Sequence, residues 1–242
     1  LFRSLIEDQI KVVLERLWRT GETLLSKPSV ADERASQLHY FRNVFPDVLP
    51  QIDRHLEEAW AANGWDPALV SDSARRPRLR FGTWVGGDRD GHPLVTAEVT
   101  RESLLDFRRH ALDLQRHKLS ELRARLSLSA NLQSPPGGFL EKLEEKASQI
   151  GDEARAILDR NPREPWRQFI GLLIAQLPPA DFDPKDAREP VGRFYRYSFN
   201  LAADLRVLRD SLEEIGAARV ARLDVDPVLR NVEVFGFHTA AL

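Results

Sequence analysis

The sequence lacks cysteine and methionine altogether, and it also lacks any long apolar run. Without cysteine the chain has no disulfide, no thiol nucleophile and no thiolate to bind a metal, which agrees with the cytoplasmic location that we expect. No apolar stretch approaches the roughly 20 residues that cross a bilayer, and no signal-peptide pattern opens the chain, so we expect no membrane association. A reading frame begins with methionine, whereas this chain begins at Leu1. We therefore expect an internal piece of a longer polypeptide rather than a trimmed chain.

The sequence also has no excess of charge of either sign. Lys and Arg total 35 against 37 Asp and Glu, which gives a formal net charge of −2. Such a chain has no global attraction to nucleic acid, and we expect no nucleic-acid partner. With 242 residues, 42% of them hydrophobic and 30% charged, the composition is typical of a globular protein that buries a sizeable core.

Most of the chain shows the three-and-four spacing of apolar residues that predicts amphipathic helices. Ser29 or Asp32 is a candidate cap for the second helix, Thr96 or Thr100 for the long central one, and Gly216 is a candidate C′ residue. Pro46 and Pro50 are expected to bracket a short junction. The expected helices cover about residues 1–25, 32–45, 48–63, 97–128, 139–160, 165–177, 191–215 and 227–234.

Two short segments have the character of strands. Residues 79–85 alternate in strand fashion after a Gly- and Pro-containing connector, and residues 235–242 resemble the start of a second strand. Two strands alone do not make a stable sheet, which again indicates an excised piece. We therefore divide the chain into a helical part (1–63), a strand with a glycine-rich loop (64–96), a second helical part (97–234) and a strand start (235–242).

One loop carries residues suited to chemistry. Gly86, Gly87 and Gly91 allow sharp turns and close approach to a ligand, while Asp88, Arg89 and Asp90 place a guanidinium between two carboxylates. His92 and Pro93 stand where a phosphate-binding P-loop needs Lys and Ser or Thr. An EF-hand is excluded because its first acid and its closing Glu are both missing. From the residues alone, a structural turn with a local Asp–Arg pair remains the alternative to a binding loop.

The run from Phe81 to Glu102, which begins Phe-Gly-Thr-Trp-Val-Gly-Gly-Asp-Arg-Asp-Gly-His-Pro, resembles the signature of the phosphoenolpyruvate carboxylase family. That signature reads Phe-x-x-Trp-Met-Gly-Gly-Asp-Arg-Asp-Gly-Asn-Pro, so Val85 and His92 depart from it. Weaker similarities flank this run: Trp18-Arg-Thr followed by Lys27-Pro and Asp32-Glu upstream, and Val234-Phe-Gly-Phe-His downstream.

The resemblance implies a mainly α-helical segment of a helix-rich, TIM-like α/β barrel containing about two barrel strands. It implies a lyase that converts phosphoenolpyruvate and bicarbonate to oxaloacetate and phosphate with Mg²⁺ or Mn²⁺, and that is a homo-oligomer when full length. Trp84 would line the pocket around the methylene end of phosphoenolpyruvate, and Arg89 would join it in binding substrate. Gly86, Gly87, Asp88, Asp90, Gly91 and His92 would form the loop of the site.

The family's catalytic-histidine, Arg-Gly-Gly and metal-binding motifs are absent from these residues. We therefore expect no catalytic residue and no metal ligand in this segment, which would supply one wall of the pocket and be inactive alone. Two alternatives remain: a non-catalytic, carboxylase-like helical scaffold or binding module, and an unrelated helical bundle whose loop matches by chance.

Several other residues favour structural roles. The basic cluster Arg75, Arg76, Arg78 and Arg80 is interpreted as a solvated strand edge rather than an anion site. Leu105, Leu112, Leu119 and Leu126 recur every seven residues, which we attribute to core packing rather than to an intermolecular zipper. Trp18, Trp60, Trp65 and Trp166 are expected to be core or half-buried aromatics, and the six histidines show no metal-ligand spacing.

Overall fold

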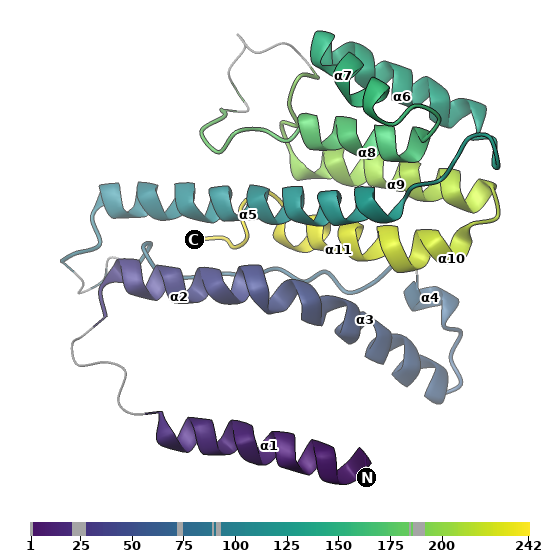
Figure 1. The fold of residues 1–242 in the computed structure, drawn as a ribbon. Coiled ribbons are helices and arrows are strands. Elements are labelled where there is room, and N and C mark those ends of the chain that lie inside the picture. The colour runs from purple at the N-terminus through teal and green to yellow at the C-terminus, as the bar shows by residue number, and fades with distance from the viewer. Residues whose placement is uncertain are drawn as a thin grey trace.

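A computed structural model describes residues 2–20, 28–71, 75–88, 90, 93–183, 185 and 192–242. This part of the chain is mainly helical, as predicted (Figure 1). The helices are α1 (Phe2–Arg19), α2 (Val30–Asn43), α3 (Phe45–Ala62), α4 (Ala68–Ser71), α5 (Ala97–Arg125), α6 (Gly137–Ile150), α7 (Asp152–Arg160), α8 (Pro165–Ala175), α9 (Ser198–Glu214), α10 (Ala218–Val220), the π-helical turn η1 (Ala221–Val225) and α11 (Asp226–Phe235).

Helix α1 lies apart from the rest of the molecule and contacts no other described helix (Figure 1). Its predicted apolar stripe is therefore exposed: Leu17 is 65% exposed and Trp18 is 90% exposed. The expectation that Trp18 is buried or half-buried is wrong, because amphipathic spacing predicts a helix but does not supply the surface that covers its apolar face. Trp65 at the end of α3 is likewise 54% exposed, whereas Trp166 is fully buried.

The boundaries of α2 and α3 follow from their caps and prolines. Ser29 caps α2 in a reciprocal capping box with Asp32, so both candidate residues take part. Pro46 lies in the first turn of α3, where its missing N–H costs nothing, but Pro50 lies inside the helix. The predicted junction at these two prolines is therefore wrong: the chain turns at Val44, one residue before α3 begins.

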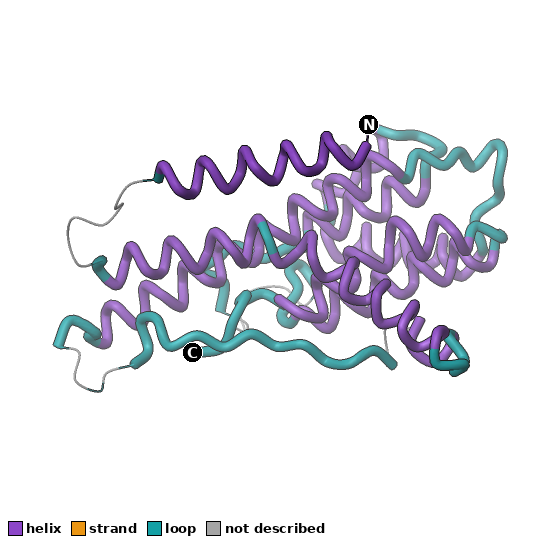
Figure 2. The backbone as a smooth tube through the Cα atoms, turned by 90° about the horizontal axis from the view of Figure 1, so that it is seen from below, coloured by secondary structure: helices purple, strands orange, loops and turns teal. Residues whose placement is uncertain are grey.

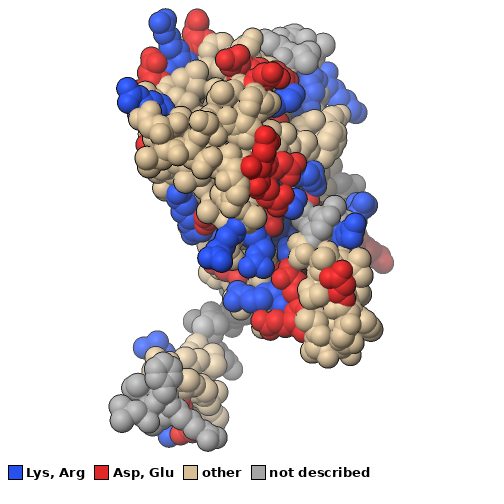
Figure 3. All heavy atoms as spheres, turned by 90° about the vertical axis from the view of Figure 1, so that its right-hand side faces the viewer, with Lys and Arg blue, Asp and Glu red and all other residues tan. Residues whose placement is uncertain are grey.

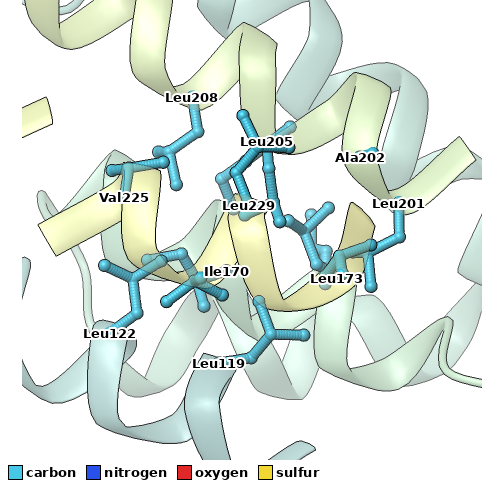
Figure 4. Close-up of a cluster of buried hydrophobic side chains, with 14 of the residues drawn as sticks. Leu119, Leu122, Ile170, Leu173, Leu201, Ala202, Leu205, Leu208, Val225 and Leu229 are labelled. Carbon is cyan, nitrogen blue, oxygen red and sulfur yellow. The ribbon is translucent and has the colours of Figure 1, made fainter. Parts of the chain in front are cut away.

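The main hydrophobic core lies among α5, α8, α9, η1 and α11 (Figure 4). Of the leucines at seven-residue spacing, Leu112, Leu119 and Leu126 lie in this core as predicted, but Leu105 is 37% exposed and does not. Arg108 and Gln115 stand where a zipper would need a second apolar column, and both are buried and bond across the fold. The Arg108 guanidinium donates to the Phe182 carbonyl, and the Gln115 amide donates to the Gly236 carbonyl at 3.1 Å.

A second hydrophobic cluster joins α2 and α3 to the rest of the molecule through aromatic rings. The ring of Phe81 stacks on Phe45 from one side and on Phe235 from the other, with centroids 4.9 and 5.5 Å apart. Phe41 meets the edges of Phe81 and Phe107. Aromatic pairs of this kind stabilise a fold beyond the area they bury. They fix the segment around Phe81 between α3 and α11.

The two predicted strands are reduced to a single parallel bridge between Gly82 and Ala241. The Thr83 amide donates to the Ala241 carbonyl and the Ala241 amide donates to the Phe81 carbonyl, both at 2.9 Å. The strand expected over 235–242 is wrong for most of its length, because α11 continues to Phe235 and a turn follows it. Figure 2 shows the two segments as loops that lie beside each other over a short distance.

On the face seen in Figure 3, acidic and basic side chains are interspersed, in keeping with the small net charge. Within the described residues, none of the helices has both the length and the apolar character that a membrane crossing requires.

Candidate functional site

The segment that carries the signature lies between the bridge at Gly82 and helix α5. The amides of Gly87 and Asp88 both donate to the Trp84 carbonyl at 2.9 Å, which closes a tight turn after the bridge. Val85 is buried beneath this turn, while the Trp84 side chain is 75% exposed. Large aromatic side chains usually bury much of their surface. The Trp84 indole instead presents a large apolar face that the described residues do not cover.

Two glycines hold the turn close to its neighbours. Gly86 has a φ of +84°, and a Cβ added there would lie 2.1 Å from the Oγ of Ser103 on α5. A Cβ on Gly87 would lie 2.9 Å from the side chain of Leu242. The first position therefore requires glycine for both its backbone conformation and its surroundings. Together they pack the turn against α5 and the residue that follows Ala241.

Helix α2 supports the turn through two side chains that sequence reasoning did not single out. Gln37 accepts a hydrogen bond from the Thr83 hydroxyl, which in turn accepts one from the Val85 amide at 3.1 Å. Arg34 donates to the Ser103 hydroxyl at 2.9 Å beneath Gly86. The spacing of Arg34 and Gln37 puts them on one face of α2. Nothing in the sequence connects that face to a loop some fifty residues later.

The predicted charged residues of the loop are only partly described. Asp88 and Asp90 are exposed, and the Asp88 carboxylate accepts a hydrogen bond from the Asp90 amide at 3.0 Å. Arg89, Gly91 and His92 lie outside the described residues, so the expected Asp–Arg pairing and the position of His92 stay predictions.

The described carboxylates of the loop do not form a metal site. Asp88 and Asp90 have no third partner, since no group of three His, Asp or Glu suited to a metal occurs in the described part of the chain. A divalent cation needs several converging oxygen ligands. The residues present here therefore do not fit the Mg²⁺ or Mn²⁺ expected from the resemblance, and they cannot form its complete ligand set.

The site has two features that could serve a ligand, namely its place beside the parallel bridge and the exposed apolar surface of Trp84. The bridge is parallel and pairs Gly82 with Ala241, so Trp84 and Leu242 both lie on the carboxyl side of the paired residues. In α/β barrels, ligands bind at this end of the strands, above the loops that follow them. The indole of Trp84 and the carboxylates of Asp88 and Asp90 are all exposed on this side of the bridge.

Comparison with known proteins gives one consistent result. The family model for phosphoenolpyruvate carboxylase matches residues 3–242. Curated relatives named phosphoenolpyruvate carboxylase include those of Methylorubrum extorquens (36% identical over 240 residues), Azoarcus sp. strain BH72 (34% over 252) and Roseiflexus castenholzii (31% over 247). The matches cover 99%, 97% and 97% of this chain but 25% of each relative. The chain thus spans about a quarter of the length of these relatives.

Proposed function

Because this chain belongs to the phosphoenolpyruvate carboxylase family, we propose that it forms one wall of the substrate pocket in a longer carboxylase. The reaction would join phosphoenolpyruvate and bicarbonate to give oxaloacetate and phosphate, which is lyase chemistry and a carbon-fixing step. In this proposal the 242 residues are inactive alone, since the sequence has no catalytic-histidine motif and its described part has no group of three His, Asp or Glu suited to a metal.

The observation that carries the proposal is the exposure of Trp84 directly after the parallel bridge. An indole that is 75% exposed buries little of its surface in this fold, whereas it buries more when a ligand or another part of the protein covers it. The position matches the ligand-binding end of a barrel. We therefore infer that the segments meeting at Gly82 and Ala241 belong to two neighbouring strands of a TIM-like barrel.

The pocket would need further residues from outside this chain. Carboxylation requires a cation and cationic side chains around the phosphate, because charge develops on the phosphoryl and enolate oxygens. Asp88 and Asp90 are too few to hold Mg²⁺ or Mn²⁺, so other parts of the longer protein would bind the metal. Assembly into a homo-oligomer and a cytoplasmic location are further parts of this proposal.

The test is the kinetics of Trp84→Ala in the full-length protein. Loss of the indole should raise the KM for phosphoenolpyruvate at least tenfold or abolish turnover, whereas Trp84→Phe should have a smaller effect. Trp65→Ala is the matched control because Trp65 is also exposed but lies at the end of α3, and it should leave both constants unchanged. Unchanged kinetics in Trp84→Ala would remove Trp84 from the site.

A non-catalytic, carboxylase-like scaffold remains the second candidate, and the unpartnered apolar stripe of α1 favours a binding role. The two candidates differ in one measurement. A full-length protein that forms no oxaloacetate from phosphoenolpyruvate and bicarbonate, with Mg²⁺ or Mn²⁺ supplied, would favour the scaffold.

A further inference from the structure

A cavity of about 340 Å³ lies at the opposite end of the segment that carries Trp84. Arg78 and Arg80 line it from that segment, Phe199 and Arg206 from α9, and Glu233 from α11. Arg78 and Arg80 precede Trp84 by six and four residues, which corresponds to about 20 and about 13 Å of extended chain at about 3.3 Å per residue, and Trp84 is not part of the lining. The cavity is therefore separate from the proposed substrate pocket.

The arginines around this cavity are of two kinds. Arg76 and Arg230 are nearly buried, and both bond to Asp53, at 3.2 and 3.1 Å. Glu57 adds a second carboxylate to Arg76. Because a buried cation without a counter-ion is very costly, these pairs are structural and neutralise each other. The prediction that the whole cluster is a solvated strand edge is therefore wrong for Arg76.

Arg78 and Arg80 are different because no carboxylate of the described residues pairs with either of them. The remaining arginine of the cavity, Arg206, is matched by Glu233 at 2.6 Å. Since Asp53 and Glu57 behind the lining balance Arg76 and Arg230, the positive charges of Arg78 and Arg80 remain unbalanced by any described carboxylate. Two guanidinium groups two residues apart on an extended segment present parallel donor pairs that suit a phosphate or carboxylate.

The other wall of the cavity is complementary to a ligand that is both anionic and apolar. The first turn of α9 supplies Ser198 and Phe199, has no acidic residue and has no side-chain cap. Its amides therefore add to the positive potential. Phe199 is 63% exposed and gives this wall an apolar surface.

We propose that this cavity binds a small organic anion, with Arg78 and Arg80 holding its phosphate or carboxylate group and Phe199 contacting its apolar part. The site is distinct from the pocket beside Trp84, and it does not depend on the carboxylase activity. It requires only that the chain folds as described.

Phenyl phosphate, titrated calorimetrically into the full-length protein that carries this chain, tests the proposal. We expect one binding event per chain at this site, and Arg78→Ala/Arg80→Ala should weaken it at least tenfold. Arg155→Ala/Arg160→Ala is the matched control, because it removes from α7 two exposed arginines that pair with no carboxylate in the described part of the chain, and it should change the dissociation constant less than twofold. Benzoate replaces phenyl phosphate in a second arm that identifies which anionic group is preferred.

Two further variants test whether phenyl phosphate binds at this cavity and not elsewhere. Trp84→Ala should leave phenyl phosphate binding at this site unchanged, which separates it from binding at the substrate pocket. Phe199→Ala should weaken phenyl phosphate but not inorganic phosphate. Equal losses in the two arginine double variants, or no loss in either, would overturn the proposal. So would the absence of any binding to the full-length protein, because another part of the polypeptide would then fill the cavity.

Discussion

Gly86 is the residue of the loop at which both the backbone and the surroundings exclude a side chain. Its φ of +84° lies in the left-handed region, and Ser103 on α5 occupies the space that a Cβ would need. Gly64 provides a natural comparison, since its φ of +75° is similar but nothing lies within 4 Å of its hypothetical Cβ. A comparison of alanine variants at Gly86 and Gly64 therefore separates the cost of backbone strain, which both share, from the cost of steric overlap, which only Gly86 has.

We predict that Gly86→Ala destabilises the chain clearly more than Gly64→Ala. Both variants should lose about 1–2 kcal/mol because alanine is strained in the left-handed region. Gly86→Ala should lose a further 1–3 kcal/mol, about the usual cost of forcing extra atoms into a packed site. Urea unfolding followed by circular dichroism measures both. Equal losses would mean that Ser103 moves away at little cost.

His110 on α5 is a titratable residue whose surroundings disfavour its charged form. Partial burial is the main cause that lowers its pKa, the Arg42 cation acts in the same direction, and Asp106 and Asp113 partly oppose both. Its Nδ1 atom is buried without a hydrogen-bond partner among the described residues. An unfolded histidine has a pKa of about 6.5. The unfolded chain therefore takes up the proton first as the pH falls.

We accordingly predict that His110 lowers stability on acidification. The stability that the neutral form of His110 allows is fully present above about pH 6.5. It is lost as the pH falls from there through the lower pKa of His110 in the folded chain. His110→Gln should therefore lose less stability than the parent between pH 8 and pH 5.5. His117→Gln is the control, because His117 lies on the same helix with a side chain 68% exposed. A parallel pH dependence in His110→Gln and the parent would contradict the prediction.

At the scale of elements, α2 connects the N-terminal half to the loop beside Trp84. Arg34 both donates to Ser103 and forms an ion pair with Asp106 at 3.0 Å, and Arg34 is mostly buried. Its removal leaves the partly buried Asp106 carboxylate and the buried Ser103 hydroxyl with fewer partners, which costs stability. The loop over α5 should then open more often.

We predict that Arg34→Ala raises the hydrogen-exchange rate of residues 82–88 without unfolding the chain. Arg42→Ala is the matched variant, since it removes the same charge two turns further along α2 from an exposed position. Exchange measured by mass spectrometry should show faster exchange in the loop for Arg34→Ala only. If both variants behave as the parent does, α2 does not hold the loop.

The elements that the sequence predicts well are those whose signals are local. The apolar period of α5, the Thr96 cap and the glycine at 216 are all found where expected, because each depends on residues within a few positions. The strand over 235–242 was wrong up to Ala240 because the chain turns directly after α11, with positive φ at Gly236 and Thr239. A strand is completed by neighbours far away in the chain, and one bridge is all that the described residues provide.

The site could be predicted only in part for the same reason. The loop was found from its glycines and from Trp84, which form one continuous run of sequence. The support from Arg34 and Gln37 was missed, because contacts between distant elements depend on tertiary packing. The pairing of Arg76 with Asp53 was missed likewise, since composition cannot distinguish a buried arginine from an exposed one.

At the scale of the whole molecule, α5 and α11 belong to both hydrophobic clusters. Phe107 of α5 and Phe235 of α11 lie in the smaller one, while Leu119 and Leu229 of the same two helices lie in the main core. Because α5 is a continuous helix of 29 residues, the two clusters cannot separate without breaking it or exposing one face. We infer that the body formed by α2–α11 unfolds as one cooperative unit, whereas α1 is not held by it.

Phe107→Ala tests whether the two clusters unfold together. Phe107 is 1% exposed, so its truncation should lower the free energy of unfolding by about 3–5 kcal/mol. Leu104→Ala, at a position 48% exposed on the same helix, should cost under about 1 kcal/mol. Hydrogen exchange across a urea series should show peptides of α2 and of α8 losing protection at the same lowered midpoint in Phe107→Ala. If α2 is exposed at low urea while α8 keeps the midpoint of the parent, the clusters are independent units that merely share a helix.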